Sequence, residues 1–500
     1  MTLTGYRLGE GPTLHHGSRG RFRALQAQPV LPRILMGATE EPDLGGYHLL
    51  GRIAHVSDLH ITDVESPARL DFMIDAAEDP RFEQSLPTPR PQQLTSSHAA
   101  ACCFATIKKL NTDMAIDAVV LTGDLVDNAQ LNELERLLCL VNGGQLAATR
   151  QPGTVEGTHT AAWSDSAVWR PADIQNHWTT MFGFPADSTI IDAVAKRVHV
   201  EPFDLATIFV RGNHDALLAG TVAWTPKMAA VSVGAAKQRG LPAAELLADA
   251  AASFRADPDL FFTGSTTVVA GDSARRPMVP TEFPAARHVQ TRIHRSPFDF
   301  VARPNDGLAV VVLDTVDENG HPDGVLSTEQ AQWLGETIAE LDRQEPETSV
   351  IVASHHGPAH HHVTIPHRDR ITGPGIVDLL CRHPNVVAWI NGHAHMASVT
   401  RHSRLGRRGF WEITAASIID WPCQFSTLAV YTHKSHGVVL TVDKHDLAAR
   451  NWTGGHTDDP VTDLGGLHRL LAANQADFGR IFPGAENYDT RDLTLVLPPR

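Results

Sequence analysis

Short apolar runs that end in acidic, histidine or glycine residues recur along this 500-residue chain and constrain its fold more than any other feature. Each run is four to eight residues long and rich in β-branched or other apolar residues, as is typical of a buried strand. Stretches with helical character lie between the first six runs, so the alternation predicts an α/β fold. These six runs span residues 49–56, 118–122, 207–210, 308–313, 349–353 and 386–390.

Three later runs, residues 409–414, 426–431 and 437–442, follow one another with connections too short for a crossover helix. This spacing predicts that the three pair with one another in an antiparallel sheet. We therefore expect two sheets packed together, with the helices outside. The expected helices cover residues 99–111, 129–139, 243–254 and 328–343, the last with Ser327 as its N-cap.

Composition narrows the class of protein. The net charge is −15, from 42 basic and 57 acidic residues, which disfavours a broad surface for nucleic acid. The five cysteines are scattered and form no C-x-x-C pair, so we expect reduced thiols and no cysteine-bound structural zinc. We expect no contact with membranes, because no run reaches the roughly 18 apolar residues of a membrane span. No signal peptide is visible near the amino terminus, so a cytoplasmic location is the default expectation.

The strand ends carry the residues that point to chemistry. Five of the predicted strands are followed at once by a polar motif of Asp, His, Asn or Gly. Imidazole and carboxylate ligands together suit Mn, Fe, Zn or Co better than Ca or Mg. In chain order the motifs are Ser57-Asp58-Leu59-His60, Gly123-Asp124-Leu125-Val126-Asp127, Gly212-Asn213-His214-Asp215, Ser354-His355-His356 and Gly392-His393-Ala394-His395.

This series resembles the metallophosphoesterase, or calcineurin-like phosphoesterase, superfamily, whose pattern runs D-x-H, G-D-x-x-D, G-N-H-[DE], H and G-H-x-H. All five blocks match in order, and the spacing supports the resemblance from about residue 48 to about residue 445. A segment within residues 413–425, Ile-Thr-Ala-Ala-Ser-Ile-Ile-Asp-Trp-Pro, looks like one found in a bacterial subgroup of similar length. The resemblance implies a four-layer α/β/β/α sandwich of two mixed sheets, with a metal site at the carboxyl ends of the strands.

The resemblance also implies a ligand set for two transition-metal ions, of which Mn, Fe and Zn are favoured. Asp124 would bridge both ions. The first ion would be held by Asp58, His60, Asp124 and His395, and the second by Asp124, Asn213, His355 and His393. His355 and His356 are adjacent and cannot both point the same way from an extended strand end, so the choice between them stays open, with His355 favoured.

Further residues take roles beside the metals. His214 is expected to face the substrate, where it would stabilise phosphoryl charge or protonate the leaving oxygen, with Asp215 orienting its imidazole. Asp127 is expected to support a ligand rather than to be one. Arg211 and His356 are candidates for substrate binding.

The segment after the last ligand pair adds two more candidates. For Asp420 and Trp421, a place in the pocket wall and plain packing are equally favoured.

Domain organisation follows from the same pattern. Residues 1–46 are rich in Gly, Pro, Arg and His and lack periodicity, which predicts an extended arm over the body of the domain. Residues 47–445 would form the catalytic domain, with insertions at about 141–206 and 216–306 around its catalytic end. Residues 446–500 would be an extension packed on it.

The leading functional hypothesis is hydrolysis of a phosphomonoester or small phosphodiester by a hydroxide that two metal ions activate. Two alternatives remain: a nuclease acting on DNA or RNA, which the acidic charge disfavours, and a scaffold that keeps the fold without catalysis. The expected partner is a small phosphate ester. The sequence leaves the substrate, the metals and the oligomeric state open.

Overall fold

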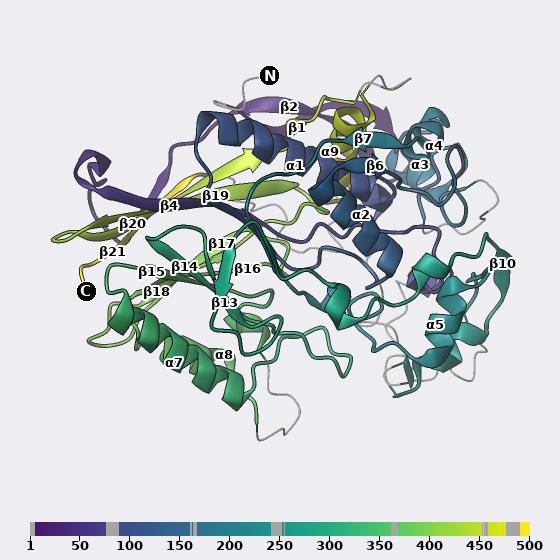
Figure 1. Ribbon diagram of the computed structural model, residues 1–500. Coiled ribbons are helices and arrows are strands. Elements are labelled where there is room, and N and C mark those ends of the chain that lie inside the picture. Colours follow the sequence, from purple (N-terminus) through teal and green to yellow (C-terminus); the bar gives the residue numbers. More distant parts are fainter. Residues whose placement is uncertain are drawn as a thin grey trace.

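The computed structural model describes residues 6–76, 90–160, 163, 168–241, 253–254, 256–361, 369–452, 454, 459–476 and 491–500. It shows a mixed α/β fold built on two large mixed sheets, one of eight strands and one of seven (Figure 1). The predicted α/β class is therefore confirmed. The helix expected over residues 243–254 lies almost wholly outside the described residues.

The eight-stranded sheet combines a parallel half with an antiparallel half. β4, β5 and β8 run parallel to one another, while β19 pairs antiparallel with both β4 and β20. In spatial order the strands are β11 (Ala286–Arg287), β8 (Thr207–Val210), β5 (Ala118–Thr122), β4 (His48–Val56), β19 (Gln424–His433), β20 (Gly437–Asp446), β21 (Leu493–Leu497) and β3 (Ile34–Met36).

The seven-stranded sheet has a parallel centre. β14, β15, β16 and β18 are parallel neighbours, and antiparallel strands flank them on both sides. In spatial order the strands are β12 (Gln290–Arg292), β13 (Phe300–Arg303), β14 (Leu308–Val312), β15 (Ser349–Ala353), β16 (Val386–Asn391), β18 (Phe410–Thr414) and β17 (Ser398–His402).

β18 corrects one prediction. The run over residues 409–414 was expected to pair with the two runs that follow it, but β18 pairs parallel with β16 in the other sheet. The two later runs do form the expected antiparallel pair, β19 and β20. The prediction was wrong because the connection between β18 and β19, residues 415–423, carries the chain from one sheet to the other.

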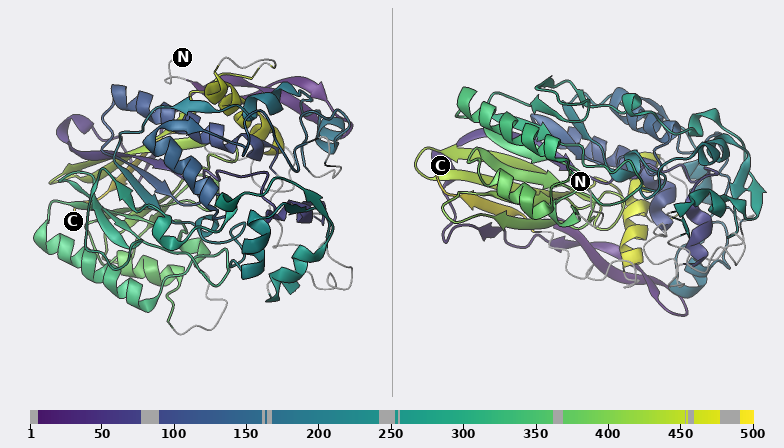
Figure 2. Two further views of the ribbon diagram at one scale, coloured as in Figure 1. Left: turned by 45° about the vertical axis from the view of Figure 1, so that its right-hand side comes forward. Right: turned by 90° about the horizontal axis from the view of Figure 1, so that it is seen from below.

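The sheets pack face to face through apolar side chains. Val120, Val310, Ile351 and Leu428, from four different strands, belong to one buried cluster between the sheets. Side chains of opposite parity along the same strands face outward and are covered by helices. α1 (Ser96–Asp113) and α2 (Leu131–Asn142) cover the eight-stranded sheet, and α7 (Thr328–Gln344) and α8 (Gly373–Leu380) cover the seven-stranded sheet (Figure 2).

The N-cap predicted for α7 is confirmed. The Ser327 side chain accepts a hydrogen bond from the backbone N–H of Gln330, which satisfies one of the free donors at the start of the helix. Among the described residues, no helix is both long and apolar enough to cross a membrane.

The first 46 residues contain more regular structure than expected. β1 (Tyr6–His16) and β2 (Arg21–Pro29) form an antiparallel hairpin, and β3 joins the edge of the eight-stranded sheet beside β21. The register of the hairpin shifts twice, after Glu10 and after Thr13. These irregularities break the alternation of polar and apolar residues that would mark a strand in the sequence.

The remaining elements lie in the insertions and near the carboxyl terminus. β6 (Gly144–Leu146) pairs with β7 (Val198–Val200), and β9 (Ala236–Gln238) pairs with β10 (Thr266–Val268). The helices are α3 (His177–Phe182), α4 (Thr189–Val194), α5 (Pro226–Val233) and α9 (Pro460–Ala476). α9 packs against α1 and against the hairpin, where Arg23 and Asn474 exchange two hydrogen bonds.

Candidate metal centre

The five polar motifs meet at one place because each follows a strand of the two packed sheets. β4, β5 and β8 of the eight-stranded sheet lead into the first three motifs, and β15 and β16 of the seven-stranded sheet lead into the last two. Parallel strands bring their carboxyl ends to the same edge of a sheet, so the motifs converge there. The structure thus brings all seven predicted metal ligands together: Asp58, His60, Asp124, Asn213, His355, His393 and His395.

The backbone of five of these seven residues is strained. Asp58, His60, Asp124, His393 and His395 have φ angles of 53°, 42°, 52°, 65° and 59°. Residues with a side chain rarely adopt this left-handed region, and each instance costs about 1–3 kcal/mol. Backbone hydrogen bonds between neighbouring strand ends hold the conformation, for example from His60 N to Asp124 O at 2.9 Å. Strain of this kind gathers at functional sites.

One buried cluster contains Asp58, His60, Asp124 and His395, whose possible ligand atoms all lie within 4.8 Å of one another. His395 Nε2 is 3.3 Å from Asp58 Oδ1 and 3.3 Å from His60 Nε2. His60 Nε2 is in turn 3.6 Å from Asp124 Oδ2. These atoms therefore surround a small space with two imidazole nitrogens and two carboxylates.

A second cluster begins on the other side of the Asp124 carboxylate. His355 Nε2 lies 3.2 Å from Asp124 Oδ2 and 3.1 Å from Asn213 Oδ1. The Asn213 amide donates to Gly220 O at 3.0 Å, which turns its oxygen toward His355. The rings of His355 and His393 are 5.1 Å apart between centroids. Asp124 Oδ2 is thus shared by the two clusters, as a bridging ligand would be.

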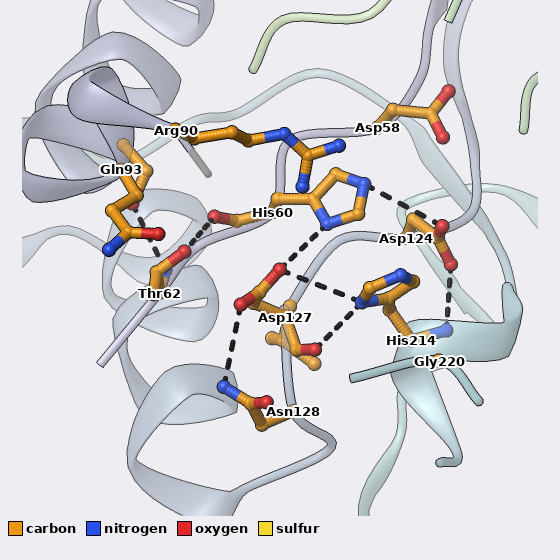
Figure 3. Close-up of polar contacts among 12 residues, drawn as sticks. Asp58, His60, Thr62, Arg90, Gln93, Asp124, Asp127, Asn128, His214 and Gly220 are labelled. Atoms are coloured by element: carbon orange, nitrogen blue, oxygen red, sulfur yellow. Dashed lines mark hydrogen bonds and ion pairs between the residues drawn. The ribbon is translucent and has the colours of Figure 1, made fainter. Parts of the chain in front are cut away.

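Three of the histidines are oriented in the same way. Nδ1 of His60 bonds to Asp127 Oδ1 at 2.9 Å, Nδ1 of His395 bonds to Asp420 Oδ2 at 2.7 Å, and Nδ1 of His355 donates to Thr122 O at 2.7 Å. Figure 3 shows the contact between His60 and Asp127. An acceptor at Nδ1 fixes the proton there and leaves the Nε2 lone pair to face the cluster, the usual arrangement around a metal-bound histidine.

Burial and the neighbouring charges act in opposite directions on the pKa values of the centre. Burial alone would raise the pKa of Asp124, but the nearby imidazoles of His355 and His214 hold it well below its usual range. Burial would lower the pKa of His395 and of His355, but the facing carboxylates raise both to about 9. The pKa of Asp58 falls to about 2, since His395 and His355 outweigh the effect of burial.

In this structure, then, the protonated imidazoles of His355 and His395 balance ionised carboxylates at the strand ends. Metal cations would supply the same positive charge when those protons leave. The donor set of imidazole, carboxylate and one amide oxygen, without thiolate, fits two transition-metal ions.

The structure distinguishes the two adjacent histidines of the fourth motif. His356 is buried, and both of its ring nitrogens are engaged, Nδ1 with Thr315 Oγ1 at 2.8 Å and Nε2 with Pro322 O at 2.9 Å. Of these two histidines, His355 is the one that directs Nε2 toward Asp124. In this arrangement His356 has no ring nitrogen left for a substrate, although its ring nitrogens lie close enough to those of His355 and His393 to form a further group of possible ligands.

His214 lies beside the first cluster and is partly exposed. Its ring packs edge-on against His60 with centroids 4.5 Å apart. Nδ1 donates to the backbone carbonyl of Asp127 at 2.8 Å, and the Asp127 carboxylate lies 3.6 Å away. The backbone N–H of His214 donates to Asp124 Oδ1 at 2.9 Å (Figure 3).

Asp215 does not take the position expected of it. Its carboxylate accepts hydrogen bonds from the backbone N–H groups of Leu125, Val126 and Gly212 at 2.8–3.0 Å. The short helical turn Asn213–Asp215 sends neighbouring side chains in different directions. Asp127 therefore orients the His214 imidazole, and Asp215 ties the third motif to the second.

The Arg211 side chain also forms its contacts away from the predicted ligands. Its guanidinium forms ion pairs of 2.7 Å with Asp314 and with Glu318 and stacks over the ring of Phe298. These contacts place it in the wall of a separate cavity of about 400 Å³. No contact in the described part of the chain joins it to the seven ligands.

The segment between β18 and β19 contains Asp420 and Trp421, for which the sequence left two roles open. Its backbone N–H groups bond to the first and last motifs, for example Ile419 N to Asp58 O at 3.1 Å. This path brings the Asp420 carboxylate to His395, with Gln92 Nε2 donating to it at 2.8 Å. Asp420 thus lies at the centre, whereas Trp421 packs against the apolar cluster under α1 and α2.

Two arginines were missed altogether, because neither belongs to a motif. Arg69 pairs with the Asp127 carboxylate on the side away from His60. Arg90 Nε contacts both oxygens of Asp420, at 3.1 and 3.2 Å. Together with burial and His214, the charge of Arg90 lowers the pKa of His60 to about 4.

Comparisons with known proteins give distant likenesses. No family model matches the chain, and no curated protein matches it. Among solved structures, a dimetal phosphatase from Danio rerio is 14% identical over 80% of this chain and 98% of its own, with a TM-score of 0.30. A Staphylococcus aureus protein described as a 5'-nucleotidase is 10% identical over 83% of this chain and 57% of its own, with a TM-score of 0.29. GAP50, the anchor in the inner membrane complex of Plasmodium, is 9% identical over 84% and 94%, with a TM-score of 0.28. Scores this low carry no argument about activity, which must come from the geometry of the site.

Proposed function

We propose that the protein is a metal-dependent phosphoric ester hydrolase of the metallophosphoesterase type, with the four-layer sandwich of that superfamily. The observation that carries the proposal is the Asp124 carboxylate, whose Oδ2 faces His60 Nε2 at 3.6 Å on one side and His355 Nε2 at 3.2 Å on the other. A carboxylate shared by two imidazole-rich clusters is what a pair of neighbouring cations requires.

The proposed ligands form two sets that share the Asp124 carboxylate. Asp58, His60 and His395 would hold the first ion with Asp124, and Asn213, His355 and His393 would hold the second with Asp124. Mn, Fe and Zn suit these donors. When bound, the two ions would act as Lewis acids that activate water and neutralise phosphoryl charge.

His214 supports the chemical step in this proposal. Because a backbone carbonyl can only accept, Nδ1 of His214 carries a proton, and Nε2 is left for the substrate. The Asp127 carboxylate lies 3.6 Å from Nδ1, and an imidazole held in this way can stabilise phosphoryl oxygens or give a proton to the leaving oxygen. Asp127 therefore positions two imidazoles, those of His60 and His214.

The test is hydrolysis of aryl phosphate monoesters and diesters by protein loaded with Mn, Fe or Zn. His214→Ala should lower kcat by about 100- to 10,000-fold while the metal content stays unchanged. Asp124→Asn should lose both metal and activity, and His199→Ala, at an exposed histidine in an insertion, is the matched control. Absence of turnover with every ester and metal would refute the proposal, whereas an active His214→Ala would refute the role of His214. Single-stranded DNA and RNA in the same panel test the nuclease alternative.

A further inference from the structure

Arg90 stands at the edge of the metal centre in a fixed orientation. It directly precedes the helical turn Pro91–Thr95, and its Nε reaches both oxygens of Asp420 at 3.1 and 3.2 Å. The same carboxylate holds His395 Nδ1 at 2.7 Å and accepts from Gln92 at 2.8 Å. The guanidinium is therefore tied, through one carboxylate, to a predicted ligand of the first ion.

The terminal nitrogens of Arg90 make no hydrogen bond to any residue that the structure describes. Within the described part of the chain, Nη1 and Nη2 of Arg90 have no hydrogen-bond partner, and the side chain is 12% exposed. The buried arginines Arg69 and Arg275 differ in this respect. Arg69 uses its terminal nitrogens on Asp127 and Gln93, and Arg275 uses its own on Ala270 O and Glu65.

The guanidinium of Arg90 lies beside the His60 imidazole of the first cluster. In Figure 3 the guanidinium lies on one side of the His60 imidazole, and His214 lies on the other. The side chains of Arg90 and His214 thus flank the first cluster. A guanidinium that is held at Nε and open at both terminal nitrogens is preorganised to bind two oxygens of one oxyanion.

We propose that Arg90 binds the terminal oxygens of the reacting phosphoryl group and makes the enzyme selective for phosphomonoesters over phosphodiesters. The inference rests on the proposed hydrolase function. A monoester has three terminal oxygens and a charge of about −1.5 to −2 at pH 7, so it offers Arg90 one oxygen more than a diester and a larger negative charge. A diester has two terminal oxygens, a single negative charge and a second organic group.

The experiment compares wild-type protein with Arg90→Ala and Arg90→Lys on an aryl phosphate monoester and the matching diester. For Arg90→Ala we expect kcat/KM for the monoester to fall about 10- to 100-fold, as for the loss of hydrogen bonds to a charged group. The value for the diester should fall less than about threefold, since fewer oxygens and less charge face the guanidinium. Arg90→Lys should retain part of the activity, and added guanidinium ion should partly restore Arg90→Ala. Arg404→Ala, which removes an exposed ion pair with Asp378, is the control.

Two further measurements separate this role from a structural one. Metal content by mass spectrometry should be the same in Arg90→Ala and in wild type, and calorimetry should show weaker binding of inorganic phosphate to the variant. Equal losses on both esters, a fall in metal content, or unchanged phosphate binding would overturn the inference. If the wild type hydrolyses neither ester, the hydrolase proposal fails, whereas an active wild type with unaltered selectivity in Arg90→Ala refutes the role of Arg90 alone.

Discussion

Asp420 offers the sharpest test of how the centre is held, through the substitution Asp420→Asn. All the groups that its side chain contacts are donors or carry a proton: His395 Nδ1 at 2.7 Å, Gln92 Nε2 at 2.8 Å and Arg90 Nε at 3.1 Å. Asparagine retains one acceptor oxygen and replaces the other with an amide NH₂. In either orientation, that NH₂ meets a donor.

The magnitude follows from the two orientations. If the NH₂ faces His395, the imidazole must move its proton to Nε2, the atom that lies 3.3 Å from Asp58, and the metal-binding lone pair is lost. If the oxygen faces His395, the NH₂ opposes Arg90 and Gln92 in a buried site. Loss of a hydrogen bond to a charged group costs about 1.5–3 kcal/mol, and replacing such supporting residues weakens metal binding by about 10- to 100-fold.

The assay is competition for the metal between the protein and a coloured chelator, with thermal unfolding to show that the variant is folded. Glu412→Gln is the matched control, because it alters a carboxylate bonded to His402 at 2.7 Å, a histidine outside the ligand set. A folded Asp420→Asn protein that binds metal within threefold of wild type would refute the reasoning that Asp420 holds His395 for the metal.

Two further predictions concern the protons on the histidines of the centre and the position of the Asp124 carboxylate. Because the pKa values of His355 and His395 are raised to about 9 without metal, both are protonated at pH 7.5, and metal binding should release about two protons. Calorimetry in buffers of different ionisation enthalpy measures this release, and affinity should rise with pH up to about 9; heats that do not depend on the buffer would contradict it. In Gly212→Ala, the new Cβ collides with Asp124 Oδ1 and N, which should weaken metal binding about tenfold or more. Gly46→Ala, in open space, should leave metal binding unchanged, and equal affinities in the two variants would count against the crowding argument.

Local sequence patterns predicted the parts of the fold that depend on interactions between residues close in the sequence. The bounds of β5 and β8 agree with the runs over residues 118–122 and 207–210, because buried parallel strands are nearly continuous apolar runs. The N-cap of α7 was equally readable, since serine satisfies a free backbone donor. The choice of strand partner could not be predicted from the sequence, because it depends on contacts between segments far apart in the chain.

The same reasoning explains which site residues could be found. The predicted metal ligands lie in tight turns directly after strands, where glycine marks the turn in the sequence, as at Gly123 with its φ of 91°. Asp215 was predicted beside His214 from proximity in sequence, but a short helical turn separates the two side chains.

The error over β18 and the uncertainty over Asp420 have one cause. Had β18 paired with β19 through a tight turn, residues 415–423 would have stayed at the end of a single sheet. Instead β18 lies beside β16, so the chain must cross from the seven-stranded to the eight-stranded sheet. That crossing passes over the carboxyl ends of β16 and β4, where Ala415 N bonds to Asn391 O at 2.9 Å and Ile419 N bonds to Asp58 O at 3.1 Å. Asp420 reaches His395 because of this path, and Arg90 reaches Asp420, so the support of the first cluster is a consequence of topology rather than of any motif.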